Sequence, residues 1–328
     1  MERVLVTGGA GYVGSHVCRE LAAHGYEPVT LDTLENGHRW AVRWGPLETV
    51  DTRDEYGVAQ VFAAYHPIAV MHFAGYTQVG ESVRRPLTYY RNNIEGITAL
   101  LSVMQQFGVE PFVFSSTAAV YGAPEETPIP ETHPLQPINP YGTSKYVSER
   151  ILSDLSGTQT LRAVSLRYFN AAGASPEGEI GEAHDPETHL IPNAIRAVYD
   201  STFTLDVFGT DFDTHDGTAV RDYIHVCDLA TAHVAALTYL LNGGETCAVN
   251  LGTGQGTTVQ EVVAACARVL GHEPRNRRVG RRVGDPPALV ADSRLAETVL
   301  NWQPQMSDLS TIIETAGKWY RGATWATN

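Results

Sequence analysis

Lysine is almost absent from this sequence of 328 residues: of its 23 lysine and arginine residues, only Lys145 and Lys318 are lysines. Acidic residues outnumber basic ones, and the formal net charge of −14 at pH 7 disfavours a protein that binds nucleic acid through a broad basic face. Any anionic ligand must therefore be held by local groups. The hydrophobic fraction of 43% is ordinary for a packed globular chain.

Other classes of protein are disfavoured by further absences. The four cysteines form neither a C-x-x-C pair nor a dense framework, which indicates buried thiols in a reducing compartment and predicts a cytoplasmic protein. No apolar run is long enough to cross a bilayer, and the glycine loop at Gly8 leaves no room for the apolar region of a signal peptide. The 12 histidines include no H-E-x-x-H motif and no His/Cys cluster with metal spacing, so we expect no metal site.

The order of apolar runs and amphipathic segments predicts the fold class. A strand, a glycine loop and a helix occupy the first 24 residues, and strands then alternate with helices as far as Asn170, which predicts a parallel sheet covered on both faces. We expect strands at 28–32, 47–51, 68–75, 111–116 and 161–170, and helices at 55–65, 87–107 and 141–155. Loops rich in glycine, proline and acidic residues then begin a smaller unit, although a helix at 227–241 and a strand from Cys247 regain the alternation. We interpret the chain as a Rossmann-like, doubly wound α/β domain, 1–175 with 223–252 returning to it, and a smaller C-terminal α/β domain, 176–328.

Three glycines separate the first strand from the first helix. Gly8, Gly11 and Gly14 form a G-x-x-G-x-x-G pattern, which lets backbone N–H groups approach a pyrophosphate at the positive end of a helix. Asp32 ends the next strand, where a carboxylate binds the ribose hydroxyls of a dinucleotide and repels a 2′-phosphate. A tight turn without a ligand would use the same glycines, but together with Asp32 they favour NAD over NADP. Asp51 ends the third strand, where it could cap a helix or contact adenine.

Tyr141 and Lys145 lie four residues apart in a segment that begins with Asn139 and Pro140, a typical helix start. Both side chains would lie on one helix face, where the ammonium and the helix dipole would stabilise a phenolate and make the tyrosine a usable general base. With 15 tyrosines in the chain, this spacing arises by chance roughly one time in ten. Lysine is kept here, however, in a chain that otherwise uses arginine, whose wide fork is poorly suited to act as a compact donor to two groups.

The strand at 111–116 ends in consecutive hydroxyl-bearing residues, Ser115, Ser116 and Thr117. They lie at the edge of the sheet where α/β proteins bind ligands, so one of them is expected to face the substrate. The alternative, which we favour for Ser116, is that the hydroxyl only satisfies backbone groups.

A series of short motifs spans nearly the whole chain in the order found in the nucleotide-sugar 4-epimerases. The motifs are VTGGAGYVGSH, HFAG, VGES, NN, SSTAAVYG, YGTSK, RYFNAAGA, GTAVRDYIHVCDLA, NLGTG and GDPPALVADSRLAETVLNW. One such string would be a weak signal, but by the ordered set the sequence resembles that family within the extended short-chain dehydrogenase/reductases. The resemblance implies reversible inversion at C4, between UDP-galactose and UDP-glucose, through a 4-keto sugar and with NAD bound throughout. It also implies a homodimer formed through the helices at 87–107 and 141–155.

The resemblance assigns catalysis to Tyr141, Lys145 and Thr117. The NAD contacts that it implies are Gly8, Gly11, Tyr12, Val13, Gly14, Asp32, Asn36, Asp51, Thr52, Phe73, Ala74, Asn92, Ser115, Tyr141, Lys145 and Tyr168. The UDP-sugar contacts that it implies are Thr117, Tyr141, Asn170, His189, Leu190, Arg221, Arg282, Asp285 and Leu289, and the C-terminal domain is thus expected to bind the UDP-sugar. The sequence departs from the family pattern at two places, so the contacts made there stay open. Thr77 occupies a position where many members have a lysine, and the segment THLIP occupies one where some members have Asn-Asn.

Other activities remain as alternatives. A 4-epimerase of another UDP-sugar, an N-acetylhexosamine or a pentose, would have the same motifs, and Leu289 is intermediate between the large and small residues that the family uses beside C2 of the sugar. A nucleotide-sugar dehydratase or decarboxylase is disfavoured, because dehydratases have Asp-Glu after the threonine where this chain has Ala118 and Ala119. A non-catalytic NAD-sensing protein is disfavoured because it would need neither Tyr141 nor Lys145.

Overall fold

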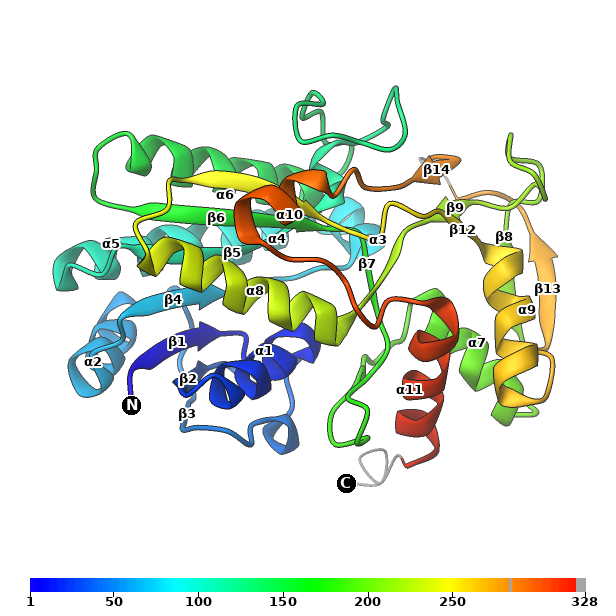
Figure 1. Ribbon diagram of the computed structural model, residues 1–328, viewed down its shortest axis with the longest axis horizontal. Helices are drawn as coiled ribbons and strands as arrows, with labels where there is room; N and C mark the ends of the chain where they lie inside the picture. The colour runs from blue at the N-terminus through cyan, green and yellow to red at the C-terminus, as the bar shows by residue number, and fades with distance from the viewer. Residues whose placement is uncertain (283–284, 323–328) are drawn as a thin grey trace.

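A seven-stranded parallel sheet lies at the centre of the computed structural model, which describes residues 1–282 and 285–322 (Figure 1). The strands follow the spatial order β11-β6-β5-β4-β1-β2-β3. Their bounds are β1 Arg3–Thr7, β2 Glu27–Leu31, β3 Leu47–Glu48, β4 Ala69–His72, β5 Pro111–Thr117, β6 Arg162–Tyr168 and β11 Cys247–Leu251. The order of the strands reverses between β1 and β4, which creates a crevice at their carboxyl ends.

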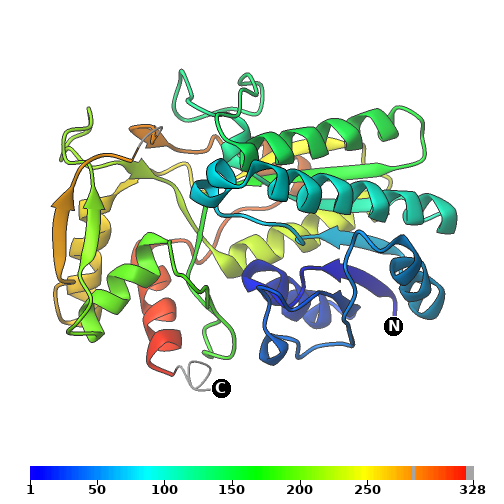
Figure 2. The ribbon, with the colours of Figure 1, turned by 180° about the vertical axis from the view of Figure 1, so that it is seen from behind.

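Helices cover both faces of this sheet. One face packs against α1 Tyr12–Ala23, α8 Val226–Leu241 and α10 Arg294–Leu300, and the other against α2 Glu55–Tyr65, α5 Gly96–Phe107 and α6 Pro140–Ser156. Figure 1 shows α1 and α8 in front of the sheet, and Figure 2 shows α5 and α6 from behind. The strands consist mostly of buried Val, Leu, Met, Ala and Phe because both of their faces are covered. The predicted Rossmann-like, doubly wound parallel sheet is therefore confirmed.

Two elements differ from the expected ranges. The segment expected as one helix at 87–107 contains α4 Pro86–Tyr90, a π-helical turn η2 Arg91–Glu95 and α5. The strand expected at 47–51 is only two residues long, and Asp51 forms hydrogen bonds with Arg53 beyond its end. Side-chain hydrogen bonds of Asn92 and Asp51 occur at these two places, and hydrophobic periodicity does not report such bonds.

The C-terminal part is built from shorter elements around its own core. Its small sheets contain β7 Asn170–Ala172 with β10 Tyr223–His225, β12 Thr257–Thr258 with β9 Val220–Arg221 and β14 Ala288–Leu289, and β13 Asn276–Val279 with β8 Leu205–Phe208. The helices α7 Leu190–Tyr199, α9 Val259–Leu270 and α11 Leu309–Arg321 pack together beside them. The domain boundaries stay a prediction, but α8 and β11 do belong to the layers of the large sheet. Among the described residues, no helix is both long and apolar enough to cross a membrane.

Candidate active site

The loop between β1 and α1 requires glycine at two positions. Gly8 has φ +73°, and a Cβ on it would lie 2.6 Å from the backbone nitrogen of Ala74, just beyond β4. A Cβ on Gly14 would lie 2.2 Å from the carbonyl oxygen of Gly8. The loop thus packs closely against the chain that follows β4, at the crevice where doubly wound sheets bind dinucleotides.

The first turn of α1 is open to an anion. Gly11 occupies the N-cap position, no side chain caps the helix, and no acidic residue lies in its first turn. Its backbone N–H groups and the positive end of its dipole can therefore bind pyrophosphate oxygens. The hydroxyl of Tyr12 donates to the carbonyl oxygen of Gly173 at 2.6 Å, and Val13 packs against the core beneath the sheet. These two side chains anchor the start of the helix.

Asp32 follows β2 and accepts hydrogen bonds at the edge of the glycine loop. Its carboxylate accepts the backbone N–H of Ala10 at 3.1 Å and that of Leu34 at 2.8 Å. Burial raises the pKa of this carboxyl group, and the two hydrogen bonds oppose the rise. Asn36 lies a few residues further on with an exposed side chain. The structure thus brings Asp32 beside the loop that is expected to hold the pyrophosphate.

The residues after β4 form the other side of the same crevice. The backbone N–H groups of Phe73 and Ala74 both donate to the carbonyl oxygen of Thr7, at 2.8 and 3.1 Å. Asn92 lies in the π-helical turn, and its side-chain oxygen accepts the N–H of Tyr76 at 3.2 Å. π-Helical turns are rare and frequently occur at functional sites, so this turn indicates a functional site nearby.

Asp51 and Thr52 lie beyond the end of β3. The carboxylate of Asp51 pairs with the guanidinium of Arg53 at 2.5 Å, and this hydrogen bond lowers the pKa of Asp51. Thr52 is buried against the start of α5, since a Cβ on Gly96 would lie 2.6 Å from its hydroxyl oxygen. The adenine contact expected of both residues stays a prediction.

Tyr141 and Lys145 lie one turn apart at the start of α6. The side chain of Asn139 caps this helix by accepting the N–H of Gly142, and Pro140 occupies its first turn, as the sequence predicts. Tyr141 is 9% exposed and Lys145 is 3% exposed. The Lys145 ammonium donates to the carbonyl oxygen of Ser115 at 2.8 Å, and burial lowers the pKa of Lys145 to about 8.

The three hydroxyls at the end of β5 have different partners. Ser115 shares a hydrogen bond of 2.6 Å with the hydroxyl of Tyr168, whose pKa burial raises. Ser116 donates to the buried carboxylate of Glu149, a side-chain partner and not the backbone group expected for it. The side chain of Thr117 lies near the Tyr141 phenol and opposes the rise in the tyrosine pKa. Thr117 is thus the hydroxyl that lies against the candidate base.

The ligand-free chain does not lower the pKa of Tyr141, contrary to the sequence-based expectation. Burial raises that pKa well above its ordinary value and outweighs the hydrogen bond from Thr117. The Lys145 ammonium is directed at the carbonyl oxygen of Ser115, where it also lies 4.8 Å from the centre of the Phe114 ring. A positive charge brought by a ligand would oppose this rise in the pKa of Tyr141.

Several residues predicted to bind the UDP-sugar meet around β9 and β14. The guanidinium of Arg221 pairs with the carboxylate of Asp285, and Leu289 lies opposite Arg221 in the parallel register of the two strands. Leu289 also packs against a small cluster that includes Ala118, the neighbour of Thr117. This packing connects the C-terminal part directly to the end of β5.

The remaining predicted substrate contacts lie outside the group around β9 and β14. Asn170 begins β7, and its side chain donates to the carbonyl oxygen of Asp222 at 3.0 Å. His189 and Leu190 form the start of α7, where the imidazole of His189 contacts a buried carboxylate. Arg282 lies over the ring of Phe208, with its guanidinium carbon 3.9 Å from the ring centre. Arg282 is thus an exposed side chain held by an aromatic ring, and its diphosphate contact stays a prediction.

A model of the NAD dependent epimerase/dehydratase family matches residues 4–252 of this chain. The chain belongs to this family. A UDP-glucose 4-epimerase of Rhizobium leguminosarum bv. trifolii is 53% identical, with 97% of each chain covered. The crystal structure of a UDP-glucose 4-epimerase from Brucella ovis in complex with NAD has a TM-score of 0.94 and 48% identity, and covers 97% of this chain and 98% of that one. A UDP-glucose 4-epimerase from Stenotrophomonas maltophila, with bound NAD and formylated UDP-arabinopyranose, has a TM-score of 0.96 and 40% identity, and covers 99% and 100%.

The cofactor in the family's name fits the residues that are present. The close approach of the glycine loop to the chain after β4, the uncapped N-terminus of α1 and the carboxylate of Asp32 are the three features that a dinucleotide needs. The Asp32 carboxylate would also repel the 2′-phosphate of NADP, so the site favours NAD.

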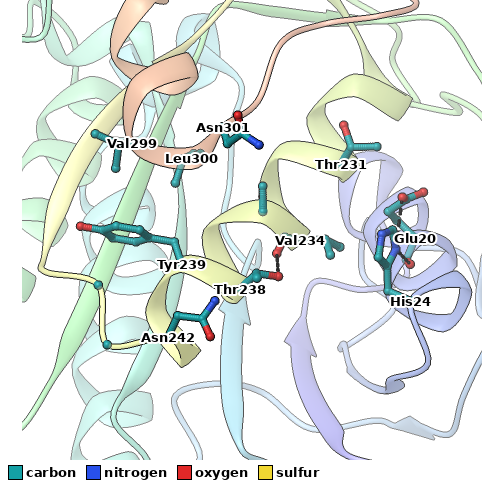
Figure 3. Close-up of a pocket in the computed structure, with 13 residues that line it drawn as sticks. Glu20, His24, Thr231, Val234, Thr238, Tyr239, Asn242, Val299, Leu300 and Asn301 are labelled. Carbon is teal, nitrogen blue, oxygen red and sulfur yellow. Dashed lines mark hydrogen bonds and ion pairs between the residues drawn. The ribbon is translucent and has the colours of Figure 1, made fainter.

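A surface pocket lies away from this crevice. Glu20, His24, Thr231, Tyr239 and Asn301 are among the residues that line it, and they come from α1, α8 and the end of α10 (Figure 3). Its lining contains none of the residues predicted to bind cofactor or substrate.

The sequence analysis missed two groups of charged residues, of which only the first is fully buried. Glu149, one turn after Lys145, pairs with Arg167 on β6. Glu182, His184, Glu187 and His189 gather in the loop before α7. The only sequence signal for the second group is E-x-H-x-x-E-x-H, a spacing that matches no common metal motif.

Proposed function

We propose that this protein interconverts UDP-galactose and UDP-glucose by inverting the configuration at C4 of the sugar. The observation that supports this most directly is the placement of Tyr141 against Thr117 at the carboxyl end of β5, beside the NAD crevice. A base and a hydroxyl at that position can act on one sugar hydroxyl while a hydride acceptor faces the carbon that bears it. The similarity to UDP-glucose 4-epimerases over nearly the full chain supports the same substrate.

In this proposal the chain's own residues move one proton. Tyr141, as phenolate, accepts the proton of the sugar's 4-hydroxyl, and Thr117 donates a hydrogen bond to the same oxygen. When bound, NAD would supply a hydride acceptor and donor for C4 and a positive charge that favours the phenolate. Lys145 holds its ammonium at the end of β5, where a ribose hydroxyl can accept from it. The proton returns from Tyr141 when the 4-keto sugar is reduced on its opposite face.

Inversion requires that the sugar turns while the nucleotide stays bound. The pair of Arg221 and Asp285 lies where the UDP part can be fixed, at the junction of β9 and the chain before β14. Elimination of water is disfavoured because Ala118 and Ala119, which follow Thr117, offer no acid or base. The direct test of this proposal is the conversion of UDP-galactose by the purified chain without added cofactor.

A homodimer forms part of this proposal. Val83 on α3 Val79–Arg84 and Leu87 on α4 are 62% and 68% exposed, although both side chains are apolar. They lie at the start of the helix pair through which the family resemblance implies dimerisation, and a second copy would cover apolar surface there. We further propose that the protein is a cytoplasmic enzyme of galactose metabolism.

Side-chain size at position 289 is expected to set the choice of sugar. Leucine is smaller than tyrosine and lies between the cluster at Ala118 and strand β9, so a larger group at C2 of the sugar is expected to fit partly. Pocket differences of this size change selectivity by about 1–3 kcal/mol, roughly ten- to two-hundred-fold. We therefore predict slower but measurable epimerisation of UDP-N-acetylglucosamine. Steady-state kcat/KM for this sugar should fall in Leu289→Tyr and rise in Leu289→Cys, with UDP-galactose turnover kept.

The matched control is Leu270→Val at the end of α9, which also changes a partly buried leucine in the C-terminal part and lies in no predicted site. If the N-acetyl rate follows neither substitution at position 289, then Leu289 only packs in the core and is not the gate.

A further inference from the structure

The loop between β7 and α7 contains four potential metal ligands within eight residues. They are Glu182, His184, Glu187 and His189. Figure 2 shows this loop between α11 and the N-terminal elements around α1. None of these four side chains has a part in the proton transfer proposed above, although the resemblance places His189 at the substrate.

The ligand atoms converge on a common centre. One atom from each of the four side chains lies within 4.8 Å of all the others. The Nδ1 atoms of His184 and His189 both contact the same carboxylate oxygen of Glu182, the former at 3.0 Å. The Glu187 carboxylate lies 3.8 and 3.9 Å from these two nitrogens. Ligand atoms around a tetrahedral zinc ion are about 3.4 Å apart, and the observed separations lie on both sides of this value, with none above 4.8 Å.

Burial and charge both favour a divalent cation at this centre. The Glu182 side chain is 5% exposed and that of Glu187 is 15% exposed, so two negative charges lie largely out of water. In the ligand-free chain the two carboxylates raise the pKa of both imidazoles, so protonated histidines balance these charges; one divalent ion would balance them with both imidazoles neutral. Zn²⁺ accepts both imidazole nitrogen and carboxylate oxygen as ligands, while Ca²⁺ and Mg²⁺ prefer oxygen alone.

We propose that Glu182, His184, Glu187 and His189 bind one Zn²⁺ ion. Four protein ligands leave no open position, which is typical of a structural zinc site. The site would fix a loop that is already held from three sides. His38 contacts the carbonyl oxygen of Ala183 at 2.8 Å, the indole of Trp319 donates to the carbonyl oxygen of Glu182 at 2.8 Å, and Tyr12 donates to Gly173 at the loop's beginning.

The position of the site indicates what the metal would do. His38 and Tyr12 belong to the cofactor-binding part of the chain, while Trp319 belongs to α11 in the C-terminal part. An ion in the loop between them would hold the start of α7 at a fixed position relative to both parts. This inference depends on the geometry of the four ligands and holds whether or not the proposed reaction is correct.

The test uses the full-length protein expressed in medium that contains zinc. After dialysis, mass spectrometry of the metal content is expected to give close to one zinc per chain for the wild type and less than about a tenth of that for His184→Gln, which keeps hydrogen-bond donors but loses the imidazole ligand. The control is His215→Gln, because His215 also lies near two carboxylates, Asp216 and Glu261, but on the exposed surface. That variant is expected to keep its zinc.

A second measurement does not depend on any variant. Wild-type protein stripped with a chelator is expected to gain about 4 °C in Tm when free Zn²⁺ is buffered at one hundred times its Kd, and His184→Gln is expected to show no such gain. Wild-type protein that retains no zinc and shows no thermal response would overturn the proposal, and the four side chains would then form an ion-pair network of protonated histidines. Equal zinc content in the wild type and His184→Gln would also overturn it.

Discussion

Tyr141→Phe is expected to lower kcat for UDP-galactose by about two orders of magnitude or more, the usual contribution of a positioned acid or base. Phenylalanine keeps the ring that packs at the start of α6 and removes only the hydroxyl that is in contact with Thr117. The fold and the bound NAD are therefore expected to remain. Steady-state rates give the change in kcat, and NAD released by denaturation gives the cofactor content of each variant.

The matched control for this experiment is Tyr146→Phe, on the same helix and also partly buried. It removes a phenol that has no part in the proposed proton transfer, so its turnover is expected to equal that of the wild type within a few-fold. If Tyr141→Phe also turned over at nearly the wild-type rate, the assignment of Tyr141 as the base would be wrong.

Arg167→Met is expected to cost about 3–5 kcal/mol of unfolding free energy. The Arg167 and Glu149 side chains are 6% and 8% exposed, and the guanidinium donates to the carboxylate at 2.6 Å and to the Tyr121 hydroxyl at 3.0 Å. Methionine fills much of the same space but leaves the Glu149 charge buried without its partner. Chemical denaturation followed by circular dichroism measures the loss.

Two further variants distinguish the cost of leaving a charge buried without its partner from the cost of lost packing. Arg277→Met breaks an exposed ion pair with Asp206, which is expected to change the stability by at most about 1 kcal/mol. The double variant Glu149→Leu with Arg167→Met removes both charges and is expected to recover most of the loss. A loss below about 1 kcal/mol in Arg167→Met alone would show that the buried pair contributes little.

Local patterns in the sequence predicted the features that depend on local geometry. The glycine loop was predictable because a side chain at Gly14 would collide with the loop's own backbone. The start of α6 was predictable because Asn139 and Pro140 are a cap and a first-turn residue wherever they occur together before a helix. The alternation of strands and helices likewise predicted the parallel sheet, since it depends on the order of periodic segments alone.

Contacts between elements were not predictable in the same way. Glu149 and Arg167 are 18 residues apart on a helix and a strand, and only the register of the fold brings their side chains together. The pKa of Tyr141 depends on burial by neighbouring elements, so spacing along one helix suggested the wrong direction for the ligand-free chain. Arg282 was predicted to contact the diphosphate because of its charge. Its contact with the ring of Phe208 was not predictable, because Phe208 lies on β8, far away in the sequence.

The measurement that tests the central claim most directly follows deuterium placed at C4 of UDP-galactose. The purified chain, with no cofactor added, is incubated with this substrate and the product is examined by NMR. Inversion with NAD held throughout predicts UDP-glucose that keeps the deuterium at C4, because the hydride leaves and returns within one active site and net redox change is zero. Failure to form UDP-glucose, a strict need for added NAD, or loss of the label to solvent would each contradict the account.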